Sequence, residues 1–273
     1  MSLHEDVRSS RFMSFPSRNE ARTTGRLLEA DDHLVACSIC GTRGEFKREE
    51  GVGIRDSFRC PKCRSMLRQR DLAQIIVDEF GNGRAYHLND LIRSGQLNDK
   101  QIYEVGFRGP IAERLRRLPG YVQSYLWDGV PFGEIKNGIR CEDLRELTFD
   151  SDSFDLILSL DVIEHVFDVE KALKEIHRVL KPGGIHAFTI PVRYPLPEQS
   201  LVRATMRRGK VNHLEPERYH VAADGSKILL VTEFGADIID MHTEAGLQLK
   251  IIRRSAPSVP QFQNATFVAR KPG

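Results

Sequence analysis

The stretch from Asp150 to Ile190 constrains the fold most, because it contains a strand, a helix and a second strand in one unit. Phe154 to Leu160 is a short apolar run after a Ser-Asp-Ser turn, which predicts a buried parallel strand. From Val169 to Leu180, apolar residues recur at the spacing of one helical face. Lys-Pro-Gly-Gly at 181–184 should end that helix, since proline cannot continue it. With Ile185 to Ile190 as the next strand, the unit predicts a parallel sheet with a right-handed crossover.

The same residues carry a resemblance to a known family. The string FDLILSLDVIEHV, followed by HRVL and then by KPGG before a strand, resembles the unit from the fourth to the fifth strand of the class I S-adenosylmethionine-dependent methyltransferases of the type 11 group. The resemblance covers about residues 101–269. It implies an α/β fold, a Rossmann-like seven-stranded methyltransferase sheet with helices on both faces.

Length and composition fit a soluble globular protein. The 273 residues, 40% hydrophobic and 29% charged, suffice for one large domain and a small one. No apolar run approaches the roughly 18 residues of a membrane span, and the N-terminus lacks the apolar segment of a signal peptide, so a cytoplasmic protein is expected. The net charge of +2 does not by itself indicate nucleic-acid binding.

Four of the five cysteines form two C-x-x-C pairs, Cys37 with Cys40 and Cys60 with Cys63, separated by 19 residues. This spacing is typical of a four-thiolate zinc ribbon. Because four protein ligands leave no position for water, the predicted zinc is structural. Two redox or disulfide pairs are the alternative, which a reducing cytosol disfavours. Cys141 is left over and is expected to be buried.

The predicted organisation has three parts: a disordered tail over 1–30, the zinc ribbon and a following helix over 31–80, and a class I methyltransferase domain over 81–273. The tail has no sustained apolar period. Basic residues gather around the second cysteine pair, namely Arg59, Lys62, Arg64, Arg68 and Arg70. They could grip nucleic acid, or they could balance the net charge of about −2 on a zinc ion with four thiolates.

The resemblance places a cofactor loop after the first strand of the sheet. Glu104 and Gly106 match the family's acidic-x-Gly-x-Gly-x-Gly pattern, whereas Arg108 and Pro110 replace its later glycines and Gly109 is displaced by one. Glycines let the backbone approach the cofactor closely, and a carboxylate at the strand end can hold its amino group. The departure from the pattern leaves open which backbone groups touch S-adenosylmethionine.

Further cofactor contacts are expected at the ends of the next strands. A ribose diol is best held by a carboxylate, and Asp128 is the nearest acid after the second strand. By the resemblance, Asp143 would accept the adenine amine and Leu144 would lie under the ring, with Glu142 as the competing carboxylate. Leu160 closes the fourth strand, where the family's substrate and cofactor meet.

Three residues are candidates for the chemistry: Asp161, His165 and His220. Methyl transfer is a displacement on a sulfonium, so positioning supplies most of the acceleration, and a base is needed only if the acceptor must lose a proton. His165 is the first candidate for that base because imidazole titrates near neutrality, although it could only brace the site. His220 lies in the long segment from Pro191 to Lys227, which predicts a partly ordered lid over the acceptor site.

The predicted lid is also basic. Arg203, Arg207, Arg208 and Lys210 would favour an anionic acceptor, unless they form only a solvated surface.

Three function classes follow. The leading hypothesis is a methyltransferase that uses S-adenosylmethionine and a structural zinc and acts on a small molecule, such as a sugar, a glycolipid or a secondary metabolite. The alternatives are an RNA methyltransferase whose zinc ribbon grips nucleic acid, and a binding protein that kept the fold but lost catalysis.

Overall fold

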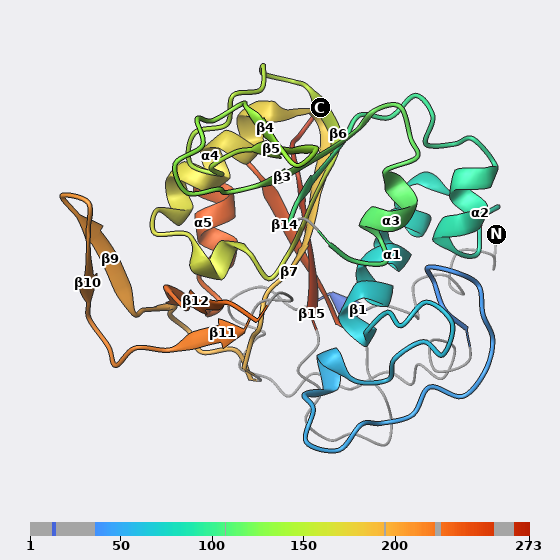
Figure 1. The fold of residues 1–273 in the computed structure, drawn as a ribbon, viewed down its shortest axis with the longest axis horizontal. Helices are drawn as coiled ribbons and strands as arrows, with labels where there is room; N and C mark the ends of the chain where they lie inside the picture. The colour runs from blue at the N-terminus through green and yellow to red at the C-terminus, as the bar shows by residue number, and fades with distance from the viewer. Residues whose placement is uncertain (1–12, 15–35, 107, 194, 222–224, 254–264) are drawn as a thin grey trace, which may run out of the picture.

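A nine-stranded sheet dominates the computed structural model, which describes residues 13–14, 36–106, 108–193, 195–221, 225–253 and 265–273 (Figure 1). Five neighbouring strands at its centre are parallel. In spatial order they are β7 (Leu180–Thr189), β6 (Phe154–Leu160), β2 (Ile102–Val105), β3 (Tyr121–Tyr125) and β5 (Ile139–Cys141). The order confirms the predicted Rossmann-like arrangement, since the chain crosses over between strands that are not consecutive.

Antiparallel strands complete both edges of the sheet. Beyond β7 lie β15 (Ala265–Arg270), β14 (Gln248–Arg253) and the two-residue β1 (Met13–Ser14). At the opposite edge β4 (Ile135–Lys136) pairs with β5. Seven of the nine strands thus form the predicted methyltransferase sheet, and β1 and β4 are short additions. Most of the expected tail, residues 1–12 and 15–30, lies outside the described residues.

The strand–helix–strand unit of residues 150–190 forms as predicted, with one correction. Strand β6 has the expected bounds, and α4 (Val169–Val179) follows it with Asp168 accepting a hydrogen bond from the Lys171 backbone. The strand predicted at Ile185 begins instead at Leu180. Lys-Pro-Gly-Gly therefore lies inside β7, where the pairing with β6 jumps from Phe154–Leu180 to Leu156–Ile185. The glycines accommodate this irregularity, and Gly183 takes a positive φ of 79°.

Helices cover both faces of the sheet (Figure 1). One face carries α4 and α5 (Ile238–Glu244), and the other carries α1 (Leu67–Phe80), α2 (Leu88–Arg93) and the short α3 (Ala112–Leu115). The helix predicted after the second cysteine pair is α1, and Gly81 follows its last residue as expected.

The segment around the cysteines and the sheet share a hydrophobic core. Ile39 and Leu72 belong to the same buried cluster as Leu156 and Ile185 of the sheet. The boundary at residue 80 stays a prediction, but the two predicted parts are packed together.

The predicted lid contains short strands and, over its described residues, no helix. These strands are β8 (Leu201–Val202), β9 (Ala204–Arg207), β10 (Lys210–His213), β11 (Tyr219–Val221) and β12 (Lys227–Leu229). Strands β9 and β10 form a hairpin that projects away from the sheet, whereas β8 pairs with β13 (Thr232–Glu233) (Figure 1). Among the described helices of the whole chain, none is long and apolar enough to cross a bilayer.

Candidate functional site

The four predicted zinc ligands lie together. The sulfur atoms of Cys37, Cys40, Cys60 and Cys63 all fall within 4.8 Å of one another. The Cys37–Cys63 sulfurs are 3.6 Å apart and the Cys40–Cys60 sulfurs 3.7 Å apart. A tetrahedral zinc ion with bonds of about 2.3 Å would separate its sulfur ligands by about 3.8 Å. The cluster therefore fits a four-thiolate zinc.

A buried arginine lies beside this cluster. Arg70 is completely buried, donates to two backbone carbonyls and stacks over the Phe46 ring at 4.4 Å. Its charge can offset the negative charge of zinc with four thiolates. Two further cations of the group are paired elsewhere, Arg59 with Glu49 at 3.3 Å and Arg68 with Asp161. Arg70 therefore supports the charge-balance explanation, whereas Arg59 and Arg68 pair with carboxylates and Lys62 and Arg64 are exposed.

Asp161 accepts hydrogen bonds from two arginines of the N-terminal segment, Arg55 and Arg68. Arg55 lies between the two cysteine pairs in a 3-10 turn (Ile54–Asp56) and donates through two nitrogens at 2.7 and 2.6 Å. Arg68 donates from α1 at 2.5 Å, and the Thr189 hydroxyl at 2.9 Å. Burial alone would raise the pKa of Asp161, but the two guanidinium charges outweigh it and hold that pKa well below its usual range.

This arrangement decides what Asp161 can do. The carboxylate stays ionised and saturated with donors, so it suits positioning better than proton abstraction near neutrality. Sequence reasoning singled out Asp161 but missed Arg55, which lies 106 positions away in the chain.

His165 and His220, both predicted as candidates, do come together. His165 follows β6 in a 3-10 turn (Ile163–His165), and its Nε2 lies 3.3 Å from Nδ1 of His220 on β11. On its other side, Nδ1 of His165 donates to the Leu229 carbonyl at 2.7 Å. Burial lowers the pKa of both imidazoles, so both are neutral near pH 7. Each can accept a proton or bind a metal in that form.

The predicted cofactor loop leaves room for a ligand. Gly106 and Gly109 take positive φ angles of 121° and 149°, and a Cβ placed on Gly106 would meet no atom within 4 Å. The glycine turn therefore fits a cofactor that approaches the backbone closely. Glu104 is buried and accepts a hydrogen bond from the Tyr121 hydroxyl at 2.8 Å. Burial raises the pKa of Glu104 to about 7, despite that hydrogen bond.

The remaining cofactor candidates lie at the carboxyl ends of β3, β5 and β6. Asp143 is buried and accepts from the Arg145 backbone and guanidinium at 2.8 and 2.5 Å. Glu142, the competing carboxylate, is tied to Arg140 and to Thr148. Glu142 accepts three hydrogen bonds from these two residues and Asp143 accepts four from Arg145, so these contacts do not favour one carboxylate over the other. Asp128 is exposed, Leu144 is buried and Leu160 is half-buried.

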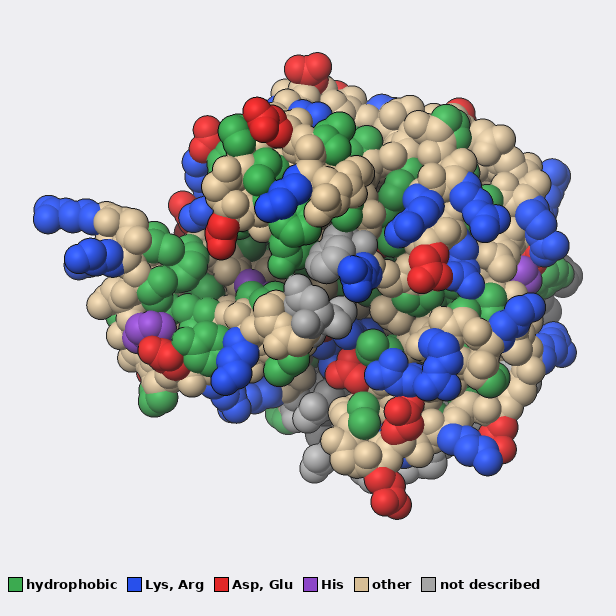
Figure 2. Space-filling model, viewed as in Figure 1, with side chains coloured by type: hydrophobic (Ala, Val, Ile, Leu, Met, Phe, Trp, Pro, Cys, Tyr) green, Lys and Arg blue, Asp and Glu red, His purple; other side chains and the backbone are tan. Residues whose placement is uncertain are grey.

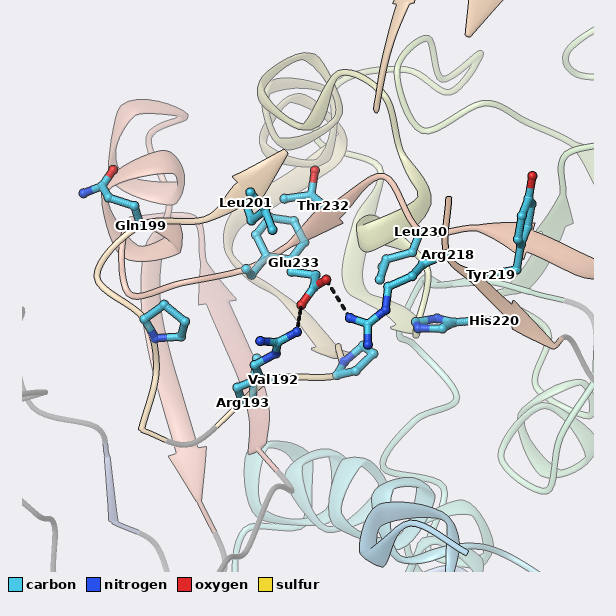
Figure 3. Close-up of a pocket in the computed structure, with 13 residues that line it drawn as sticks. Val192, Arg193, Gln199, Leu201, Arg218, Tyr219, His220, Leu230, Thr232 and Glu233 are labelled. Carbon is cyan, nitrogen blue, oxygen red and sulfur yellow. Dashed lines mark hydrogen bonds and ion pairs between the residues drawn. The ribbon is translucent and has the colours of Figure 1, made fainter. Parts of the chain in front are cut away.

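A pocket of about 520 Å³ lies between the end of β7 and the strands of the predicted lid (Figure 3). Arg193, Arg218, His220 and Glu233 are among its lining residues. Glu233 pairs with Arg193 at 2.7 Å and with Arg218 at 2.8 Å, and also with Arg203 at 2.7 Å. Burial alone would raise the pKa of Glu233, but the three arginines lower it. Because Arg193 and Arg218 line the pocket beside this one carboxylate, its wall carries excess positive charge.

The basic residues predicted on the lid divide into two groups. Arg203 is buried against Glu233 behind the pocket. Arg207, Arg208 and Lys210 are exposed around the turn of the β9–β10 hairpin, and they do not line this pocket. Lys and Arg side chains accordingly gather at the end of the projecting hairpin (Figure 2). A further pocket of about 530 Å³, lined by Arg108, Arg116 and Trp127 among others, lies near β3.

Comparison with known proteins supports the same family. Residues 125–188 match the family model Methyltransf_11, described as a methyltransferase domain. The chain is 26% identical over 181 residues to a ubiquinone biosynthesis O-methyltransferase of Pseudomonas syringae, a match covering 60% of this chain and 72% of the relative. It is 38% identical over 134 residues to the enzyme of that name from Coxiella burnetii, covering 42% of this chain and 56% of the relative.

Solved structures also resemble the chain. The aminopentose methyltransferase CalS10 from Micromonospora echinaspora, bound to S-adenosylmethionine, aligns with a TM-score of 0.42 and 16% identity over 72% of this chain and 96% of that one. The matched residues run from the end of β3 into β7 and include Asp161. The comparisons and the fold support an S-adenosylmethionine-dependent methyltransferase, in which residues 125–188 match the type 11 group and four cysteines in the arrangement of a zinc ribbon precede them.

Proposed function

We propose that this enzyme methylates an oxygen of a small, anionic molecule held in the pocket beside β7 and β11. The position of the pocket carries the proposal. It lies at the carboxyl ends of the parallel strands, and His220 on its wall contacts His165, directly beyond β6. In doubly wound sheets, ligands bind at this edge. The relatives named ubiquinone biosynthesis O-methyltransferase support a small-molecule acceptor and an oxygen as the methylated atom.

The residues of this chain would divide the work of holding the cofactor. Gly106 and Gly109 would admit it against the backbone, Asp143 would accept its adenine amine, and Leu144 and Leu160 would supply apolar contacts. When bound, S-adenosylmethionine supplies an electrophilic methyl group on a sulfonium. The protein then needs to hold the acceptor in line with that group and to keep water away. Zinc in the cysteine cluster would be structural, since four thiolates complete its coordination.

The charge of the pocket supports an anionic acceptor. Three arginines converge on the single carboxylate of Glu233, so two positive charges have no partner in that group. Arg193 and Arg218 are about half or more exposed, at 65% and 53% of their side chains, and can turn toward a bound anion. Planar guanidinium groups bind carboxylate and phosphate well. A sugar, glycolipid or secondary metabolite with such a group would fit this wall.

Calorimetric titration of the full chain with S-adenosylmethionine, and with its demethylated product, tests the proposal. We expect both to bind, and Asp143→Asn to weaken binding at least tenfold, about 1.4 kcal/mol. Asp150→Asn, which changes an exposed carboxylate outside the site, is the matched control and should leave the affinity unchanged. Failure of the unaltered chain to bind either compound would favour the alternative of a binding protein that kept only the fold.

A further inference from the structure

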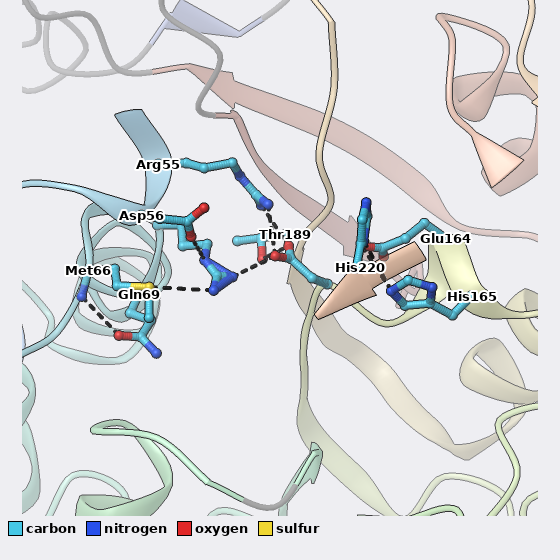
Figure 4. A network of polar contacts seen from close by, with 10 residues as sticks. Arg55, Asp56, Met66, Gln69, Glu164, His165, Thr189 and His220 are labelled. Carbon is cyan, nitrogen blue, oxygen red and sulfur yellow. Dashed lines mark hydrogen bonds and ion pairs between the residues drawn. The ribbon is translucent and has the colours of Figure 1, made fainter. Parts of the chain in front are cut away.

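We propose that Glu164, His165 and His220 form a second divalent-metal site, separate from the cysteine cluster, and that zinc is its best-fitting ion. This inference goes beyond the proposed function, because methyl transfer as described above needs no metal at this position. Glu164 and His165 lie in the turn after β6, and His220 approaches from β11 (Figure 4).

The three ligand atoms are spaced as a metal would require. Nε2 of His165 and Nδ1 of His220 are 3.3 Å apart, and Oε1 of Glu164 lies 3.7 Å from each of them. A tetrahedral ion with bonds of about 2.0–2.1 Å would separate its nitrogen and oxygen ligands by about 3.3–3.5 Å. One nitrogen pair already has this spacing, and the carboxylate needs to move by only a few tenths of an ångström.

The buried Glu164 carboxylate independently points to a bound cation. Glu164 is 1% exposed, and neither of its oxygens has a hydrogen-bond partner among the described residues. The two nearest arginines do not supply one, because Arg55 donates to Asp161, and Arg68 contacts Asp161 and Asp56. A buried carboxylate without a partner is costly, and a bound cation would remove that cost.

The proton on His165 is placed as in metal sites. Its Nδ1 lies 2.7 Å from the Leu229 carbonyl, which can only accept a hydrogen bond, so Nδ1 carries the proton. The lone pair of Nε2 therefore points toward Glu164 and His220. Metal-binding histidines commonly donate their other ring nitrogen to a backbone carbonyl in this way, because the contact fixes the ring and its tautomer. The Val231 backbone also donates to the Glu164 carbonyl at 2.9 Å, which anchors the turn.

Two imidazoles and one carboxylate would leave a fourth position open. His220 also lines the 520 Å³ pocket, so that position can be reached from the pocket by water or by an oxygen of a bound molecule. Three protein ligands with one exchangeable position are characteristic of zinc sites that act on ligands, unlike the closed four-cysteine cluster.

Cobalt reconstitution of the full chain tests the inference, because cobalt replaces zinc and its absorption reports the ligands. We expect two cobalt ions per chain. One should give the intense thiolate charge-transfer bands of the cysteine cluster, and the other only weaker ligand-field bands. Glu164→Gln and His220→Ala should each remove the second ion and weaken cobalt binding there at least tenfold, while the thiolate bands remain.

His213→Ala is the matched control, since His213 at the end of β10 pairs with Glu217 at 3.3 Å and its replacement should leave both ions in place. His220 is partly exposed, so its variant is expected to fold even if Glu164→Gln does not. One cobalt per unaltered chain, or two ions retained in His220→Ala, would overturn the proposal. Calorimetry with S-adenosylmethionine separates this result from failure of the proposed function.

Discussion

Three carboxylates near the carboxyl ends of β2 and β6 differ mainly in their partners. Glu104 has a phenol, Asp161 has two guanidinium groups, and Glu164 has no hydrogen-bond partner in the described part of the chain. A neutral donor does not outweigh the cost of burying a charge, whereas two cations do. The pKa of Glu104 is therefore raised and that of Asp161 lowered, although both are acidic side chains at strand ends.

The raised pKa of Glu104 predicts a pH-dependent stability. The folded state holds the proton up to about pH 7, whereas the unfolded chain releases it near its ordinary value of 4.5. This group's contribution is therefore fully present below the unfolded pKa and is lost as the pH rises through 7. Glu104→Gln should gain up to about 3 kcal/mol relative to the unaltered protein between about pH 5 and pH 8. Urea unfolding at the two pH values measures this difference.

Glu113→Gln provides the control, because Glu113 is a largely exposed glutamate on α3 that pairs with its neighbour Arg114 at 3.2 Å. It should change stability equally at both pH values. A parallel shift of the two unfolding curves for Glu104→Gln would show that Glu104 does not titrate near neutrality.

Residues with local geometric requirements could be predicted from the sequence, and contacts between distant segments could not. The four cysteines were found because thiolates two positions apart on a turn can face one ion. Arg55 was not, since no local pattern marks a cation that reaches a carboxylate 106 positions away. Likewise His165 and His220 lie 55 positions apart in the chain. His220 is on β11, which pairs with β12, and His165 contacts Leu229 of β12, so their proximity depends on tertiary structure.

At the scale of elements, the buried parallel strands could be predicted from the sequence, whereas the strands of the predicted lid could not. Five of the seven residues of strand β6 are apolar, as is typical of a strand covered on both faces. Strands β9 to β12 are largely exposed, so their sequences carry no comparable apolar pattern, and prolines suggested only an irregular lid. The short helix α2 was also missed, since six residues give too few turns for a helical period.

The arginines of the pocket wall lead to a prediction about the acceptor. Arg193→Ala combined with Arg218→Ala should weaken binding of protocatechuate, an anionic molecule with two hydroxyl groups, about tenfold, because two charge-assisted contacts are lost. Arg203 remains to pair with Glu233, so the carboxylate is not left alone. Calorimetry gives the affinity for this probe and, separately, for S-adenosylmethionine, which should not change.

The hairpin offers a control with the same loss of charge. Arg207→Ala combined with Arg208→Ala removes two exposed cations that lie outside the pocket, and it should leave protocatechuate binding as it was. Equal weakening by both double variants would point to the overall charge of the enzyme rather than to the pocket wall.

At the scale of the whole molecule, the cysteine segment is packed into the core of the enzyme and is not a separate module. Its buried residues belong to the same core as β6 and β7, and α1 packs against that face of the sheet (Figure 1). From the same segment, Arg55 and Arg68 reach Asp161 at the carboxyl end of β6. The cysteine cluster and the candidate active site are therefore connected through both packing and charge.

This connection predicts that loss of zinc will disturb the site. Cys60→Ser combined with Cys63→Ser should release the metal of the cysteine cluster and loosen the segment, because a module this small is held together by its metal. Asp161 would then lose the Arg55 charge while remaining largely buried, and Arg68 would be its remaining cationic partner. We expect the Asp161 amide, which donates to the Thr189 carbonyl at 2.9 Å, to exchange its hydrogen faster in deuterated water.

Cys141→Ser separates this effect from the loss of any buried thiol. Cys141 is completely buried at the end of β5, but it lies outside the metal cluster, so its replacement should leave both the zinc content and the exchange at Asp161 unchanged. The informative comparison is between two amides in the double variant: Asp161 beyond β6, which faces the cysteine segment, and Val179 in α4 on the opposite face of the sheet. If the metal acts through Arg55 and the shared core, exchange should accelerate at Asp161 by a larger factor than at Val179. Release of zinc with no change at Asp161 would mean that the segment folds and holds Arg55 in place without its metal.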